Sequence, residues 1–116
     1  MLDVDGLKIV NDRRGHSAGD ELLRGMASRW ATIVRESDML ARLGGDEFGV
    51  LLEDTDADAA QTLADRLDAA LDDGQTASLG MAVWDGIESA EGLIARADAA
   101  MYDRKRARRD ELGTRA

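Results

Sequence analysis

Near its middle the chain reads Met39-Leu40-Ala41-Arg42-Leu43-Gly44-Gly45-Asp46-Glu47-Phe48-Gly49-Val50-Leu51-Leu52. Two apolar runs flank the Gly-Gly step, and two acids follow it directly. Because glycine reaches the positive φ angles of tight two-residue turns, this pattern predicts a β-hairpin with strands at residues 39–43 and 48–52. The acids have two interpretations: a solvated turn, or carboxylates beside side-chain-free backbone that a bulky anionic ligand can approach closely.

Amphipathic helices are predicted on both sides of this hairpin. Apolar residues recur at helical spacing between residues 19 and 35 and again after residue 56, which indicates one buried face on each helix. The two stripes are Leu22, Leu23, Met26, Ala27, Trp30, Ile33 and Val34, then Ala60, Leu63, Ala64, Leu67, Ala70 and Leu71. Asp54-Thr55-Asp56 supplies N-cap chemistry for the second helix, and Asp73-Gly74 is expected to end it.

The two ends of the chain complete the pattern. Residues 1–4 read as the end of a short strand, residues 6–11 as a helical turn, and residues 11–19 as a loop rich in turn formers. Residues 76–84 alternate as a strand, and Ser89 can cap a third helix that runs on to Arg109. The order is βαββαβ plus one helix, which predicts an α+β fold: a ferredoxin-like antiparallel sheet with helices packed on one face.

The composition restricts the kinds of protein this can be. At 116 residues and 44% apolar content, the chain suits one globular domain. It has no cysteine, which excludes disulfides and thiolate metal sites, and no apolar run approaches the ~20 residues of a membrane span. The N-terminus has no signal-peptide pattern, so a cytoplasmic location is expected. The net charge of −9 argues against nucleic acid polymers as partners but permits a small anionic substrate that arrives with a divalent cation.

Two acids are candidates for a metal site. Asp3 ends the first strand and Asp46 lies at the hairpin tip, and in a βαββαβ sheet these strands can be neighbours. Two hard oxygen ligands with open positions suit Mg²⁺ that is bound to substrate phosphates. The alternative is that they are two surface acids in an acid-rich chain.

Several motifs resemble one known family. Gly44-Gly45-Asp46-Glu47-Phe48 spells the GGDEF signature, and the run from Asp3 to Asp12, with Gly15-His16 and Gly19-Asp20, looks like the first block of that family. Residues 78–82 resemble its late strand, and residues 97–102, followed by Lys105, resemble its last helix. Because the matches run in order over nearly the whole chain, residues 1–116 are similar to a diguanylate cyclase (GGDEF) domain, with the nucleotide-cyclase or polymerase-palm kind of fold that this implies.

The resemblance implies roles for individual residues. Asp3 and Asp46 match the Mg²⁺ carboxylates (Mn²⁺ is the other candidate ion), with the backbone carbonyl of Val4 as a further ligand, and Glu47 matches a second catalytic acid. The implied substrate contacts are Asn11 and Asp20 to guanine, Lys8, Lys105 and Arg109 to phosphate, and the backbone at Gly44 and Gly45. Taken alone, Asn11 is typical of a turn and Asp20 of a helix start, and the basic run at residues 104–109 is typical of a solvated helix end that complements the dipole. His16 is interpreted as a structural loop residue.

A second, inhibitory site is also implied. Arg35-Glu36-Ser37-Asp38 is an RxxD motif, and five residues separate Asp38 from Gly44, as in the family's site for cyclic di-GMP. Arg66 aligns with its supporting arginine. Arginine can bind a phosphate with two parallel hydrogen bonds and stack on a base.

The activity implied by the resemblance is the condensation of two GTP into cyclic di-GMP with release of pyrophosphate, in a homodimer that brings two bound nucleotides together. The family's domain normally begins upstream of the Asp3 position, with a helix and a full first strand, so this sequence is expected to lack that helix and part of the first strand. Two other interpretations therefore stay open: a module that binds GTP or cyclic di-GMP without turnover, and a fragment with no function of its own.

Overall fold

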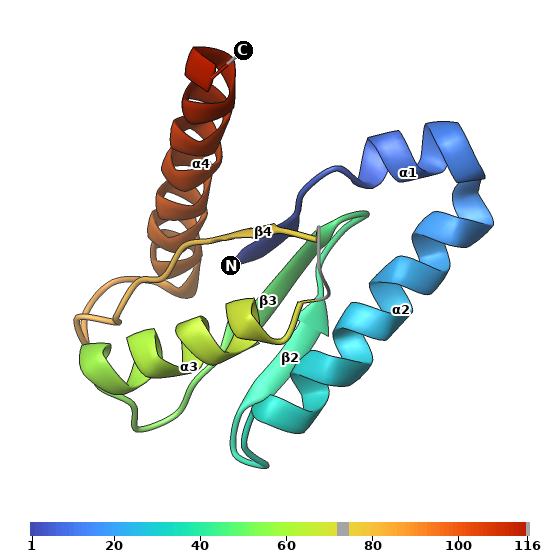
Figure 1. Cartoon of the computed structure of the whole chain (residues 1–116). Helices are drawn as coiled ribbons and strands as arrows, with labels where there is room; N and C mark the ends of the chain where they lie inside the picture. The colour runs from blue at the N-terminus through green and yellow to red at the C-terminus, as the bar shows by residue number, and fades with distance from the viewer. Residues whose placement is uncertain (72–74, 116) are drawn as a thin grey trace.

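The computed structural model describes residues 1–71 and 75–115, with side chains described as far as residue 110. One four-stranded antiparallel sheet, in the order β2-β3-β1-β4, carries four helices (Figure 1). In chain order the elements are β1 (Leu2–Val4), α1 (Leu7–Arg14), α2 (His16–Ile33), β2 (Met39–Arg42), β3 (Glu47–Leu51), α3 (Ala57–Ala69), β4 (Ala77–Leu79) and α4 (Ala90–Arg115). The α+β class and the antiparallel sheet predicted from the sequence are confirmed.

The predicted hairpin forms between β2 and β3. Its register pairs Met39 with Leu51 and Arg42 with Phe48, and the N–H of Leu43 donates to the carbonyl of Glu47 at 2.9 Å to close the turn. On its other side β3 pairs with β1, and β1 pairs with β4. The first strand is therefore central, as its sequence position in a βαββαβ plan requires.

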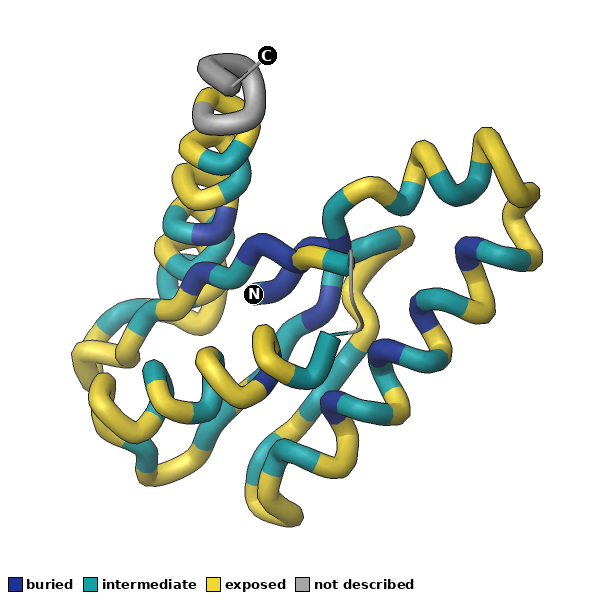
Figure 2. The backbone as a smooth tube through the Cα atoms, viewed as in Figure 1, coloured by how far each residue is buried: buried dark blue, intermediate teal, exposed yellow. Residues whose placement is uncertain are grey.

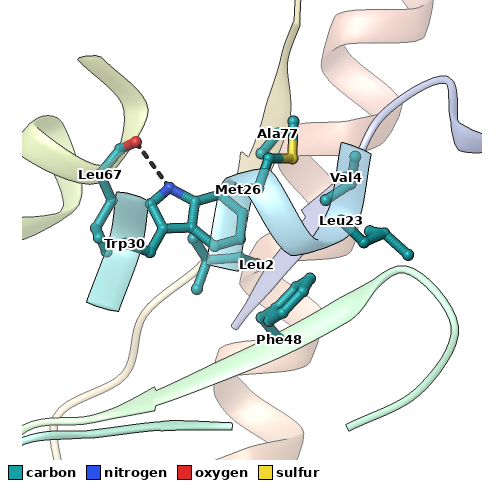
Figure 3. Close-up of a cluster of buried hydrophobic side chains, with 8 residues drawn as sticks. All are labelled: Leu2, Val4, Leu23, Met26, Trp30, Phe48, Leu67 and Ala77. Atoms are coloured by element: carbon teal, nitrogen blue, oxygen red, sulfur yellow. Dashed lines mark hydrogen bonds between the residues drawn. The ribbon is translucent and has the colours of Figure 1, made fainter. Parts of the chain in front are cut away.

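The main core lies between one face of the sheet and helices α2 and α3. Figure 2 shows buried positions recurring along α2 on the side that faces the sheet. Trp30 is 1% exposed; its ring meets Phe48 edge to face at 5.2 Å, and its Nε1–H donates to the Leu67 carbonyl at 3.0 Å (Figure 3). Trp30 thus connects α2, α3 and the sheet. The core is otherwise mostly aliphatic, because the chain has few aromatic residues.

Helix α4 covers the opposite face, so the expectation of helices on one face only was wrong. Side chains alternate along β1: Leu2 and Val4 belong to the core under α2 and α3, whereas Asp3 points to the other side and contacts Lys105 of α4. Gly80 follows β4 at the closest approach of this helix, where an added Cβ would overlap the α4 backbone. The basic third helix is therefore packed against the sheet rather than only solvated.

The predicted helix starts are confirmed. Asp56 accepts a hydrogen bond from the N–H of Ala59 at 2.8 Å, and Ser89 accepts one from the N–H of Gly92 at 3.1 Å. These are N-cap bonds to amides that the helix itself leaves unpaired, and each typically stabilises a helix by ~1 kcal/mol. The predicted end of α3 at residues 73–74 lies outside the described residues. Among the described helices none is long and apolar enough to cross a membrane.

The loop predicted at residues 11–19 was wrong. These residues belong to the end of α1 and the start of α2, separated only by Gly15. The N–H of Gly15 still donates to the Asn11 carbonyl at 2.9 Å, and its φ of +87° turns the chain sharply into the next helix. Turn-forming residues here mark a helix-to-helix corner, and His16 is the exposed first residue of α2 rather than part of a loop.

The strand predicted at residues 76–84 is also shorter than expected. Its alternation continues to Trp84, but β4 ends at Leu79. Gly80 exchanges two hydrogen bonds with Met1, at 2.8 and 2.9 Å. The ladder between β1 and β4 joins Leu2–Val4 to Ala77–Leu79, and side-chain alternation without backbone pairing does not make a strand.

Candidate active site

The end of β1 and the hairpin tip meet at one edge of the sheet. Asp3 pairs with Glu47 across the β1–β3 ladder, and the N–H of Val4 donates to the Asp46 carbonyl at 3.0 Å. Because the strands are antiparallel, the carboxyl end of β1 necessarily lies beside the start of β3 (Figure 1). The predicted convergence of Asp3 and Asp46 is therefore observed.

Asp3 is held in an unusual state for a carboxylate. Its residue is 7% exposed, its Oδ2 accepts a hydrogen bond from the Lys105 ammonium at 2.7 Å, and its Oδ1 is buried with no hydrogen-bond partner among the described residues. Burial raises the pKa of Asp3, contact with the Asp46 carboxylate raises it further, and these effects outweigh the opposing contact with Lys105. A second positive charge at this point would relieve both the unpaired oxygen and the repulsion between carboxylates.

The donors present fit a hard divalent cation. The candidate ligands are the unpaired Asp3 Oδ1, the carboxylate of half-buried Asp46 and the backbone carbonyl of Val4, all of them oxygens. Across the described part of the chain there is no group of three or more His, Cys, Asp or Glu side chains that could hold a metal by themselves. Such a site would leave coordination positions open to water or to substrate phosphate oxygens, as Mg²⁺ prefers.

Glu47 lies on the same edge and interacts with a residue that sequence reasoning missed. Burial raises its pKa, and the charge and hydrogen bonding of Asp98 on α4 raise it further, followed by smaller effects of Asp3 and Asp46. Asp98 stands seven residues before Lys105, which is two helical turns, so both side chains fall on the face of α4 that meets the sheet. That spacing was visible in the sequence, but it could not show which surface the helix covers.

Two cations of α4 reach the end of β1. Lys105 contacts Asp3, and although burial alone lowers the pKa of Lys105, its hydrogen bond and attraction to Asp3 raise it overall. One turn later Arg108 donates to Asp5 at 2.8 Å and to the Ala77 carbonyl at 3.0 Å. Arg108 lies in the basic run whose composition indicates a solvated helix end, and its contact with Asp5 is a second feature that the sequence did not reveal.

The hairpin tip is open and held by an arginine. Arg42 donates to the carbonyls of Gly44 and Gly45, at 3.3 and 2.9 Å, so its side chain braces the turn from within the hairpin. Both glycines are exposed, and a Cβ added at Gly45 would have no atom within 4 Å. The backbone at this tip is accessible to a large ligand, which is what the sequence interpretation required.

The candidate guanine contacts lie on the corner between α1 and α2. Asn11 is partly buried on α1, and a Cβ on Gly19 of α2 would overlap its side-chain oxygen, so the two helices touch at this point. Asp20 directly follows Gly19, which places it at the same corner, and Lys8 is exposed on α1. Arg109 is exposed on α4, next to Arg108.

Comparison with known proteins identifies the family. A family model described as "Diguanylate cyclase, GGDEF domain" matches residues 1–111. The chain belongs to the GGDEF family of diguanylate cyclases. Diguanylate cyclase DgcP of Pseudomonas aeruginosa is 40% identical over 122 residues, which cover 97% of this chain and 18% of DgcP. Diguanylate cyclase A of Treponema denticola is 36% identical over 97% of this chain and 33% of its own length. This chain therefore spans about a fifth to a third of the length of these two relatives.

Solved structures agree with the fold of this GGDEF domain. The crystal structure of the GGDEF domain of TpbB (YfiN) from Pseudomonas aeruginosa has a TM-score of 0.84 at 39% identity, over 91% of this chain and 73% of that one. The GGDEF domain of DgcB from Caulobacter crescentus, solved in complex with cyclic di-GMP, has a TM-score of 0.82 at 30% identity, over 91% and 70%.

The RxxD residues of this GGDEF domain form a compact group away from the metal candidates. Arg35 makes two side-chain hydrogen bonds to Asp38, at 3.0 and 3.1 Å, and also donates to the Glu53 carbonyl and the Thr55 hydroxyl. This contact lowers the pKa of Asp38 and raises that of Arg35. The guanidinium is therefore fixed at the base of the hairpin. Arg66 is exposed on α3.

Proposed function

We propose that this GGDEF domain condenses two molecules of GTP into cyclic di-GMP and releases pyrophosphate, with Mg²⁺ or Mn²⁺ as cofactor. The observation that carries the proposal is the buried, unpaired Asp3 oxygen beside Asp46 at the tip of the GGDEF hairpin. An evolved fold removes such an arrangement unless something uses it, because a buried acceptor without a partner costs ~1–3 kcal/mol. Membership of the family agrees with this activity.

The residues at the sheet edge divide the chemistry among them. Asp3, Asp46 and the Val4 carbonyl would hold the cation. When bound, the ion neutralises phosphate charge and lowers the pKa of the attacking 3′-hydroxyl. Lys105 brings a further positive charge to the phosphates, and the open backbone at Gly44 and Gly45 lets them approach the turn. We assign to the Glu47 carboxylate, next in sequence to Asp46, the acceptance of the hydroxyl proton.

Base selection would come from the corner of α1 and α2. A carboxylate such as Asp20 accepts from both N1–H and the 2-amino group of guanine, which adenine cannot offer, and the Asn11 amide adds a donor and an acceptor. A site built for these hydrogen bonds can reject an analogue without them by ~10⁴-fold. Lys8 on the same helix and Arg109 on α4 would add phosphate contacts.

A homodimer would complete the reaction. One domain offers one set of these residues, whereas each 3′-hydroxyl must attack the α-phosphorus of the other nucleotide. Two domains that face each other supply this proximity, which replaces an unfavourable encounter between two dilute substrates.

Feedback by the product is a second part of the proposal. Arg35 and Asp38 stand at the family's RxxD offset from the hairpin, and Arg35 is already fixed by Asp38, Glu53 and Thr55. A fixed guanidinium binds a phosphate with less entropic cost than a free one. The DgcB domain from Caulobacter crescentus was solved with cyclic di-GMP, which supports product binding in the family. Arg35→Ala should weaken cyclic di-GMP binding by at least ~10-fold in calorimetry, and an unchanged affinity would remove this site.

The decisive experiment incubates the purified protein with GTP and MgCl₂ and separates the products by anion-exchange chromatography. Cyclic di-GMP should accumulate together with pyrophosphate, ATP should give no equivalent product, and Asp46→Asn should lower the rate by at least ~10²-fold. If the protein binds GTP tightly but forms no product at any protein concentration, it is a binding module and the proposed activity is wrong.

A further inference from the structure

Two charged pairs connect α4 to the end of β1, and they differ in kind. Lys105 contacts Asp3 and Arg108 contacts Asp5. The two cations are three residues apart and so share one face of α4, and the two acids are two residues apart in the sequence. The first pair belongs to the proposed metal site. The second pair has no part in the function proposed above.

Both carboxylate oxygens of Asp5 have hydrogen-bond partners, whereas one carboxylate oxygen of Asp3 has none among the described residues. Asp5 Oδ2 accepts from Arg108 and from the Thr76 hydroxyl, both at 2.8 Å, and Oδ1 accepts from the Ser78 hydroxyl at 3.1 Å. The Asp5 N–H also donates to the Thr76 carbonyl at 2.9 Å. Both carboxylate oxygens and the backbone N–H of Asp5 thus have hydrogen-bond partners in β4, in Thr76 just before it, or in α4. In contrast, Asp3 keeps one buried oxygen unpaired.

A cation at Asp3 would weaken the attraction between Asp3 and Lys105. The ammonium hydrogen-bonds to Oδ2 of Asp3 at 2.7 Å, and a divalent ion at the unpaired Oδ1 would repel it. The phosphates of the substrate would then offer Lys105 an alternative anion. If Lys105 turned toward a phosphate, its pair with Asp3 would no longer hold α4 against the sheet.

We propose that Arg108 and Asp5 are positioning residues that keep α4 docked while Lys105 moves from Asp3 to a substrate phosphate. The inference rests on the proposed function. Arg108 suits the task because it donates to both Asp5 and the Ala77 carbonyl, and so ties α4 to β1 and β4 together. Its contacts do not involve the proposed metal ligands, so the pair persists when the cation binds.

The matched test compares Arg108→Met with Arg106→Met. Both substitutions remove one positive charge from α4, but Arg106 is exposed, whereas Arg108 is partly buried against the sheet. Calorimetric titration with GTP and MgCl₂ should show at least ~10-fold weaker binding for Arg108→Met and less than ~2-fold for Arg106→Met. Arg108→Lys should restore most of the affinity, since an ammonium can still reach Asp5. The affinity for MnCl₂ alone should stay within ~2-fold in all three variants.

A double-mutant cycle separates positioning from a merely structural role. If Arg108 acts through Lys105, then Arg108→Met should weaken GTP binding in the parent protein but have less than ~2-fold effect in a Lys105→Met background. Equal losses in both backgrounds, with cyclic di-GMP formation intact, would overturn this inference alone. An equal loss of MnCl₂ binding would also overturn it, because Arg108 would then support the carboxylates rather than Lys105. Absence of GTP binding by the parent protein would overturn the proposed function together with the inference.

Discussion

Replacing Asp46 with asparagine should make the metal-free protein more stable while it removes the response to divalent cations. In the folded protein Asp46 places a second carboxylate against buried Asp3, and both burial and this contact raise the pKa of Asp3. Asparagine keeps the size of the side chain and removes the like charge. The substitution therefore relieves an electrostatic repulsion that a bound cation would also relieve.

Coulomb's law sets the scale of the effect. Two unit charges about 4 Å apart repel by ~4 kcal/mol at an effective dielectric constant of 20. The gain will be smaller, because Asp46 is only half buried and Lys105 already neutralises part of the Asp3 charge. We expect ~1–2 kcal/mol, which for a domain of this size raises the melting temperature by about 4–8 °C.

The gain should depend on pH with a definite sign. Below the ordinary pKa of an aspartate, Asp3 is protonated in both the folded and the unfolded chain, and Asp46→Asn gains little. As the pH rises from that value through the raised pKa of folded Asp3, the unfolded chain loses its proton first, so the stability of the parent protein falls. The advantage of Asp46→Asn should grow over this window and then level off.

Differential scanning fluorimetry across this pH range, with EDTA and then with MgCl₂ or MnCl₂, measures both effects. The cation should stabilise the parent protein by ~2.7 kcal/mol at one hundred times its dissociation constant, and should not stabilise Asp46→Asn. Asp103→Asn makes the same charge change at an exposed position of α4. This control should neither raise the stability of the metal-free protein nor remove the stabilisation by the cation. A metal-free Asp46→Asn protein that melts at or below the parent temperature would refute the reasoning about the carboxylate pair.

Three further substitutions test the packing and the base contacts. Gly80→Ala should lower the free energy of unfolding by ~3 kcal/mol, because the added Cβ overlaps the α4 backbone; urea denaturation measures this, and a loss below ~1 kcal/mol would mean that the helix docks more loosely. Gly19→Ala should displace the Asn11 amide and reduce the preference for GTP over ATP at least ~10-fold in competition binding, and an unchanged preference would contradict the role proposed for Asn11. Trp30→Phe should cost ~1–2 kcal/mol, because the Leu67 carbonyl loses its buried partner, and a cost near zero in the same urea assay would show that this bond adds nothing.

The parts of the fold that follow from local pattern were predictable from the sequence. The hairpin needed only a Gly-Gly step between apolar runs, and the starts of α3 and α4 needed only Asp56 and Ser89. In each case the physical cause lies within a few residues of the feature. The extent of β4 could not be predicted in this way, because it depends on backbone pairing with β1, which is distant in the sequence.

The part of the candidate site that lies at the end of β1 and in the hairpin turn was predictable from the sequence. Antiparallel pairing alone brings Asp3 and Asp46 together, and that was expected from the order of elements. The contributions of α4 were not predictable from composition, because they depend on which face of the sheet the helix covers. Lys105 entered through family resemblance, whereas Asp98 and Arg108 were identified only from their contacts.

Acidic side chains outnumber basic ones at this edge of the sheet. Among the described side chains, five carboxylates lie near two cations, namely Asp3, Asp5, Asp46, Glu47 and Asp98 near Lys105 and Arg108. Arg108 pairs with Asp5 and Lys105 with Asp3, while the N-terminal ammonium of Met1 interacts with Asp98 and Glu47. Burial is the main cause of the raised pKa values of Asp3 and Glu47, and the neighbouring carboxylates raise them further. A chain with a net charge of −9 would repel a nucleoside triphosphate at such an edge. A divalent cation reverses this locally, so cation binding should precede or accompany nucleotide binding, and GTP should bind weakly in EDTA.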